Sequence, residues 1–174
     1  TLTILKNGTY ALQSYENIVR VDMDLLDSIE KFEPKKPISA VYYDGNSKNY
    51  YVKRFQIETR EDGKQHSFIS DHKDSKLIFV STSHNPMIQV EVLKGKSKEK
   101  LIYDLDLVEF IDVKGWKALG NRLTQYDFKG KIKDLSTYEV PIEIGIEEVE
   151  TEKKSNFEEL PKPNFKDGVQ GTLF

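Results

Sequence analysis

The sequence predicts an all-β fold made of repeated antiparallel hairpins. Short stretches in which apolar and polar residues alternate are separated by turns that contain glycine, which is the pattern of half-buried strands. The pattern recurs, because units begin near Leu2, Ile38 and Leu77, at spacings of 36 and 39 residues. No long amphipathic helix interrupts it. A recurrence of this length is typical of repeated all-β architectures.

The first unit contains the strongest hairpin signal. In "TLTILKNGTYALQSY" the dipeptide Asn7-Gly8 suits a type I′ turn, in which both central residues have positive φ. Leu5 would then pair with Tyr10, and both would share one face of the hairpin with Leu12. The stretch "VDMDLLDSIEKF" fits either a helix or a strand, and we interpret it as a strand followed by a turn.

The two later units repeat this plan. "ISAVYY" and "NYYVKRFQIE" flank a turn at Asp44-Gly45, and "KLIFVS" and "MIQVEVL" flank the loop "TSHNP". We therefore expect each of these pairs of strands to form a hairpin.

The composition indicates one modest domain followed by an acidic tail. The chain has 174 residues, 37% hydrophobic and 32% charged, and the absence of cysteine excludes disulfides and thiolate metal sites. With no run of about 18 apolar residues and no leader, we expect a cytoplasmic protein without membrane contact.

Residues 1–140 are predicted to form the domain and residues 141–174 a largely disordered tail. The segment from Tyr138 to Phe174 carries a net charge of −5, whereas residues 1–137 carry +2. Beyond Val149 the tail has few large apolar residues with which to offset the entropy of ordering it. It is expected either to solubilise the chain or to compete with an acidic ligand for a basic surface.

Signals for catalysis are poor. His66, His72 and His84 lie in polar surroundings without metal-ligand spacing, and we expect all three at the surface. The sequence has no phosphate-binding loop, no nucleophile elbow and no cysteine nucleophile. We assign no catalytic residue, no metal site and no cofactor to this chain.

Two clusters of cations are present although the net charge is −3. The window 114–133 carries +5, since its only carboxylate is Asp127, and its cations are Lys114, Lys117, Arg122, Lys129, Lys131 and Lys133. In "KGKSKEK" alternate positions carry cations, which an extended or hairpin loop would project to one side: Lys94, Lys96, Lys98 and Lys100. Both clusters suit the phosphates of double-stranded DNA, bound without sequence preference.

A glycine-containing loop lies at the start of the first cluster. The stretch "DVKGWKALGNRL" contains Gly115, Trp116, Gly120 and Asn121. Glycines allow backbone amides to approach a phosphate closely. The indole of Trp116 can anchor the loop in the core or stack outward, and we favour the core anchor.

Three stretches, "FIDVKGWKALGNRL", "YYVKRFQIE" and "KLIFVSTS", resemble a known family. They are similar to the C-terminal domain of the A subunit of bacterial type II topoisomerases, DNA gyrase and topoisomerase IV, and more similar to topoisomerase IV. The resemblance covers most of residues 1–137. It implies a β-pinwheel, a propeller-like ring of four-stranded blades that exchange strands with their neighbours. About three blades would fit this length.

The resemblance also implies a function and partners. Such a domain holds or bends duplex DNA on a basic rim. Its partners are the N-terminal catalytic part of its subunit and the ATPase B subunit. The parent enzyme is nucleoid-associated and uses ATP and Mg²⁺. Gyrase carries a Q-R-R-G-G-K-G box for wrapping DNA. Here "WKALGNRL" keeps Lys117, Gly120 and Arg122 but lacks the adjacent glycine pair. The loop thus resembles a degenerate box, as in topoisomerase IV, whose domain positions DNA for relaxation and decatenation.

Two other classes of function stay open. A propeller-like protein-interaction module would show an exposed apolar patch and no affinity for DNA at moderate salt. A carbohydrate-active β protein would need two carboxylates that face each other across a cleft. The density of cations favours DNA binding over both.

Overall fold

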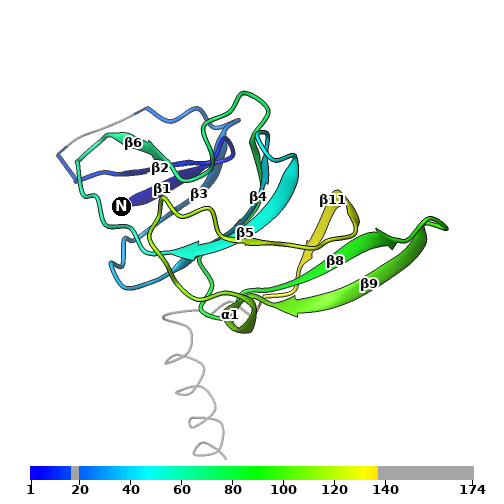
Figure 1. The fold of residues 1–174 in the computed structure, drawn as a ribbon. Coiled ribbons are helices and arrows are strands. Elements are labelled where there is room, and N and C mark those ends of the chain that lie inside the picture. The colour runs from blue at the N-terminus through cyan, green and yellow to red at the C-terminus, as the bar shows by residue number, and fades with distance from the viewer. Residues whose placement is uncertain (17–19, 137–174) are drawn as a thin grey trace, which may run out of the picture. The chain divides into compact units, whose positions relative to one another are not determined.

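The computed structural model describes residues 1–16 and 20–136, and these form three antiparallel sheets (Figure 1). The one helix in this part of the chain, α1 (Leu107–Phe110), has four residues. The predicted all-β class is therefore confirmed. The acidic tail, residues 141–174, lies outside the described residues. Its disorder stays a prediction.

Each sheet is built around one hairpin, and a strand from later in the chain pairs with the first strand of that hairpin: β3 with β1, β7 with β4 and β11 with β8. Sheet 1 has the order β3-β1-β2-β6, sheet 2 the order β10-β5-β4-β7 and sheet 3 the order β11-β8-β9. The strands are β1 (Leu2–Leu5), β2 (Thr9–Leu12), β3 (Leu26–Glu30), β4 (Ile38–Asp44), β5 (Asn49–Phe55), β6 (Gln65–Ser67), β7 (Lys76–Ser81), β8 (Met87–Lys94), β9 (Glu99–Asp106), β10 (Asn121–Arg122) and β11 (Asp127–Asp134).

Two strands are exchanged between sheets. Strand β6 follows the hairpin of sheet 2 along the chain but pairs with β2 of sheet 1, and β10 follows the hairpin of sheet 3 but pairs with β5 of sheet 2. This agrees with the strand exchange that the resemblance implies. Within residues 1–16 and 20–136, sheet 3 has three strands instead of the expected four, because no strand there pairs with the outer edge of β9.

The first hairpin forms at the predicted place with a different register. Leu5 pairs with Thr9 and Ile4 with Tyr10, so the predicted pairing of Leu5 with Tyr10 is wrong by one residue. The reason is the turn: Gly8 has a φ of 85°, whereas Asn7 has no positive φ, and its Oδ1 accepts a hydrogen bond from the Thr9 amide at 3.1 Å. The loop therefore has three residues, and the type I′ turn is wrong.

Two further expectations about the strands are corrected. The strands β7 and β8 do not pair with each other, because the loop between them leads from sheet 2 to sheet 3. The third hairpin, β8 with β9, therefore begins at Met87 and not near Leu77. In "VDMDLLDSIEKF" the strand β3 is present, but the turn precedes it.

Sheet 2 separates two hydrophobic cores. Successive residues of a strand point to opposite faces, so Ala40 joins one core and Val41 the other. The first core adds residues of sheet 1 such as Ile4 and Tyr10, and the second adds residues of sheet 3 such as Val90. Both faces of sheet 2 are thus covered, one by each neighbouring sheet.

Across residues 1–16 and 20–136, we find no helix with the length and apolar character needed to cross a membrane.

Candidate nucleic-acid interface

The segment 112–123, called here the Trp116 loop, runs beside β5. The Lys114 amide donates a hydrogen bond to the Arg54 carbonyl at 2.9 Å, and at the other end the Leu123 amide donates to the Tyr50 carbonyl at 2.8 Å. Between these points β10 pairs with β5. The loop is therefore held by backbone hydrogen bonds at several points along one strand.

The side chain of Trp116 anchors this loop, as the sequence analysis predicted. The indole packs against the first core and meets the ring of Tyr10 edge-on, with 6.0 Å between the ring centroids. The ring of His66 lies 5.6 Å from the indole and stacks on Tyr10 at 5.5 Å. The expectation of a surface position for His66 is therefore wrong, because two aromatic rings cover the imidazole. His84 is exposed as expected, and His72 is partly buried.

A buried lysine ties the Trp116 loop to the sheet. Lys53 on β5 is 3% exposed, and its Nζ donates hydrogen bonds to the carbonyls of Phe68 at 2.7 Å and Trp116 at 2.6 Å. Burial disfavours the charged form and lowers the pKa of Lys53 to about 8. Sequence reasoning missed this residue. One signal was available. Lys53 lies two residues before Phe55 and shares its face of the strand, so the side chain of Lys53 could be expected to point into the core with that of Phe55.

The two glycines of the loop differ in whether the structure has room for a side chain. Gly120 has a φ of 97°, and a Cβ there would collide with the Val52 carbonyl oxygen. Close approach of backbone to backbone therefore requires glycine at this position. Next to it, the Tyr42 hydroxyl donates a hydrogen bond to the Leu119 carbonyl at 2.6 Å. Gly115 has open space where a Cβ would lie, so nothing in the structure requires glycine there.

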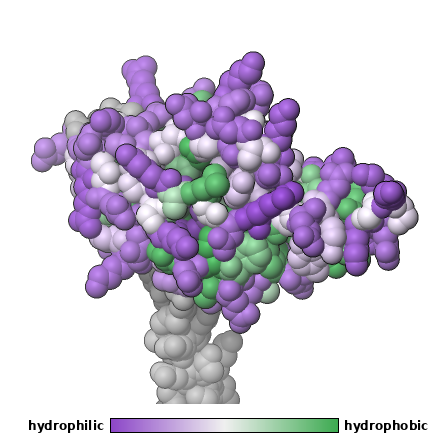
Figure 2. Space-filling view, viewed as in Figure 1, coloured by the Kyte–Doolittle hydropathy of each residue, from purple (hydrophilic) through white to green (hydrophobic). Residues whose placement is uncertain are grey.

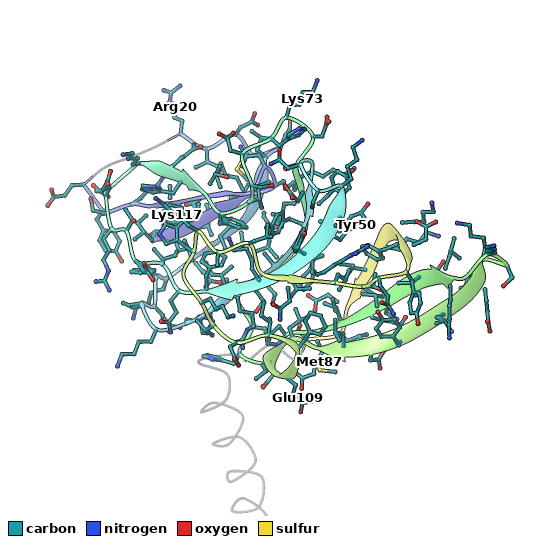
Figure 3. All side chains as sticks on the ribbon, in the orientation of Figure 1. Arg20, Tyr50, Lys73, Met87, Glu109 and Lys117 are labelled. Carbon is teal, nitrogen blue, oxygen red and sulfur yellow. The ribbon has the colours of Figure 1, made fainter. Side chains whose placement is uncertain are left out.

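The three cations of the Trp116 loop are exposed. Lys114, Lys117 and Arg122 take part in no ion pair within residues 1–16 and 20–136. The Nζ of Lys117 lies 5.1 Å from the centre of the Trp116 ring, and Figure 3 shows this lysine on the loop. Asn121 is also exposed. These side chains are accessible to a ligand from solvent.

The other seven predicted cations lie together on sheet 3. Strand β11 pairs with β8, so Lys129, Lys131 and Lys133 come beside the β8–β9 hairpin that carries Lys94, Lys96, Lys98 and Lys100. Figure 1 shows this hairpin extending away from sheets 1 and 2, and Figure 2 shows mainly hydrophilic residues at its far end. The window 114–133 is thus divided between two surfaces, the Trp116 loop and sheet 3.

The expectation that Lys94 to Lys100 project to one side is wrong, because a tight turn reverses the chain between them. Gly95 and Lys98 both have positive φ, and the Lys98 amide donates to the Gly95 carbonyl at 3.2 Å. Lys94 continues the inward-facing positions of β8, with its Nζ 5.7 Å from the Tyr126 ring. Lys100 pairs with Leu93 and so points to the opposite face.

Two carboxylates partly neutralise sheet 3. Asp127 contacts the Nζ of Lys98 at 3.1 Å and of Lys129 at 3.2 Å. Hydrogen bonds from these two lysines lower the pKa of Asp127. Glu91 lies 3.7 Å from Lys100 and 4.0 Å from Lys131. Four of the seven cations are therefore shared with carboxylates, in exposed pairs that a competing polyanion can break.

An open hollow of about 860 Å³ lies beside the Trp116 loop. Its lining includes Asn7, Lys53, Ser70, Trp116 and Lys117. In the described part of the chain, no three His, Asp or Glu side chains converge as metal ligands would. The lining also includes the carboxylate of Asp71 and apolar residues, so the hollow by itself does not indicate one class of ligand.

Together, the exchanged strands and the exposed cations define an all-β module with two cationic surfaces. The chain matches the family described as the topoisomerase C-terminal domain of Bacteroidota over residues 1–136, and it belongs to that family. No curated protein and no solved structure matches the chain. The family supports the expected likeness to a topoisomerase C-terminal domain, without separating gyrase from topoisomerase IV.

Proposed function

We propose that this domain binds duplex DNA without sequence preference and positions it for strand passage by a type II topoisomerase. The observation that carries the proposal is the exposure of all ten predicted cations in a member of a topoisomerase domain family. Six of the ten have no carboxylate partner in the described part of the chain: Lys94, Lys96, Lys114, Lys117, Arg122 and Lys133.

Phosphate binding is favoured over base reading. Specific recognition of base edges usually needs a helix or a β-ribbon in the major groove. The one helix in residues 1–16 and 20–136 has four residues and carries no cation. The tip of the β8–β9 hairpin, residues 94–99, has no Arg, Asn or Gln for a bidentate contact with a base edge. Lysine and arginine on loops and strand faces suit the evenly charged DNA backbone instead, and the energy comes mainly from the release of counterions.

We propose further that the parent enzyme resembles topoisomerase IV more than gyrase. The loop between Trp116 and Leu123 lacks the adjacent glycine pair of the gyrase box, and Gly120 serves contact with Val52. By this reading the domain holds or bends DNA for relaxation and decatenation. The catalytic part of the same subunit and the ATPase B subunit would be its partners, and the parent enzyme would use ATP and Mg²⁺.

The test is a titration of the chain with two duplexes of equal length and unrelated sequence at several salt concentrations. We expect equal affinity for both duplexes. If about five phosphates are neutralised, log K should fall against log salt with a slope of roughly −4 to −5. Absence of binding at low salt would refute DNA binding, and a strong preference for one duplex would refute backbone recognition.

A further inference from the structure

The free edge of β9 distinguishes sheet 3 from the other two sheets. In sheets 1 and 2 the second strand of the hairpin is covered by an exchanged strand, β6 beside β2 and β10 beside β5. Within residues 1–16 and 20–136, no strand takes the equivalent place beside β9. No described strand therefore uses the backbone N–H and C=O groups on this edge, which is an arrangement that can accept a further strand.

The side chains of β9 are incompletely covered. On the inward face, Leu101, Tyr103 and Leu105 are only partly buried, whereas Val90 and Val92 on the adjacent β8 are fully buried. On the outward face, Ile102 is 54% exposed. A strand added to this edge would cover apolar surface on both faces.

The outward-facing residues of β9 form a pattern that is complementary to itself. Apart from Asp106, which caps α1 and accepts a hydrogen bond from the Val108 amide at 2.9 Å, they are in chain order a cation, an apolar residue and an anion: Lys100, Ile102 and Asp104. Read in the opposite direction, the same positions give an anion, an apolar residue and a cation. An antiparallel copy centred on Ile102 therefore places each Lys100 opposite an Asp104.

We propose that the edge of β9 docks a second copy of this chain, and that two β9 strands pair antiparallel about Ile102 into one continuous six-stranded sheet. A two-fold axis passes between the two Ile102 side chains, as a symmetric dimer requires. On the other face Leu101 meets Tyr103 of the second copy. The proposal does not depend on DNA binding.

The pattern selects this register over its neighbours. A shift that centres the pairing on Tyr103 puts Ile102 opposite Asp104, which sets an apolar residue against a charge. The same shift puts Lys100 opposite Asp106, but that carboxylate already accepts a hydrogen bond from the Val108 amide. A shift that centres it on Leu101 puts Lys100 opposite Ile102. Pairing about Ile102 leaves one kind of poor contact, between Glu99 and Leu105, which occurs once at each end of the paired strands. Opposite charges thus specify the register that also pairs apolar residues.

Charged residues on an edge strand often prevent association with another strand. The mass of the chain in solution shows whether the charges of β9 prevent association or direct it. The full chain is studied without DNA by analytical ultracentrifugation over a wide range of concentration at low salt. We expect the average mass to rise from 20.2 kDa toward twice that value. Because the contact is one pair of strands, association should be weak. A chain that stays monomeric at the highest concentration overturns the proposal.

Charge reversals then test the surface and its register. Lys100→Asp and Asp104→Lys each place like charges opposite each other twice, so each variant alone should associate at least about tenfold more weakly. An equimolar mixture of the two should form a heterodimer with the affinity of the wild type, as should the double variant with itself. Circular dichroism confirms that each variant is folded.

A third variant, Ile102→Lys, keeps the test decisive if a reversal disturbs the ion pair of Lys100 with Glu91. It sets two lysines face to face on the two-fold axis and should abolish the dimer. Single variants that associate as well as the wild type would show that another surface forms the dimer. A mixture that fails to recover association would contradict the register. Either result overturns the proposal.

Discussion

The Trp116 loop and the β8–β9 hairpin both present exposed cations, but they are held in different ways. The loop takes its shape from groups that do not face solvent: the Trp116 indole, the Lys53 ammonium and the close contact of Gly120 with Val52. The hairpin takes its shape from strand pairing, and several of its lysines form ion pairs with Asp127 or Glu91.

The two regions therefore differ in whether the exposed cations also contribute to the internal contacts of the fold. In the loop, the residues that hold the fold and the exposed cations are different residues, so we expect removal of the cations to leave the structure intact. In sheet 3 four of the seven lysines pair with Asp127 or Glu91, whereas Lys94, Lys96 and Lys133 have no carboxylate partner among the described residues. A polyanion that contacted the four paired lysines would have to break exposed ion pairs, whereas one that contacted the loop would not.

The largest effect on the loop is expected from Gly120→Ala. A side chain there combines a positive φ of 97° with a collision against the Val52 carbonyl oxygen. We expect the free energy of unfolding to fall by about 3 kcal/mol or more, measured by urea denaturation. The matched control is Gly115→Ala in the same loop, which has open space and should change stability by less than about 0.5 kcal/mol. Equal effects at the two glycines would show that the loop is not held against β5.

A second effect comes from the pKa of Lys53, which burial lowers from 10.5 to about 8. Below pH 8 the side chain is protonated in the folded and unfolded chains, and the cost of burying its charge is fully present. Between the two pKa values the unfolded chain binds a proton that the folded chain does not, so stability rises with pH. The gain should be roughly 2 to 3 kcal/mol.

The variant Lys53→Met isolates this effect. It carries no titratable group at the position, so the stability of the wild type relative to the variant should increase from pH 7 to pH 10. Urea denaturation at several pH values measures the difference. A difference that is constant across this range would mean that Lys53 has an ordinary pKa and is not buried as a cation.

A smaller effect is expected in sheet 3 from Asp127→Asn. This change removes an anion and releases Lys98 and Lys129 for phosphate. Affinity for DNA at low salt should rise about tenfold, with a salt slope steeper by roughly 1 to 2, while stability changes by less than about 0.5 kcal/mol. Glu16→Gln removes an exposed carboxylate from the sheet 1 side of the chain and serves as control. Equal gains from both variants would indicate a general effect of net charge.

Local signals predicted part of this structure well. Glycine turns after Asn7 and Asp44 indicated two hairpins correctly, and the single tryptophan was correctly placed in the core. These features depend on a few neighbouring residues or on one large apolar side chain. Features that depend on distant partners were not predictable from such signals. The spacing could not show that β7 and β8 belong to different sheets.

The candidate site shows the same limit. All ten predicted cations are exposed, but the sequence grouped them by proximity along the chain. Pairing of β11 with β8 instead brings Lys129 to Lys133 beside the hairpin and away from the Trp116 loop. The burial of Lys53 was missed because its two acceptors, the carbonyls of Phe68 and Trp116, lie far from it in sequence.

The most direct test compares two triple variants in the salt dependence of DNA binding. Replacing Lys114, Lys117 and Arg122 by Ala removes three cations that have no carboxylate partner, so the slope of log K against log salt should become shallower by roughly 2 to 3. Replacing Lys94, Lys96 and Lys98 by Ala should change it by roughly 1 to 2, since Lys98 is already paired with Asp127. If the second variant loses DNA binding and the first keeps the slope of the wild type, the Trp116 loop is structural and the assignment of its cations to DNA is wrong.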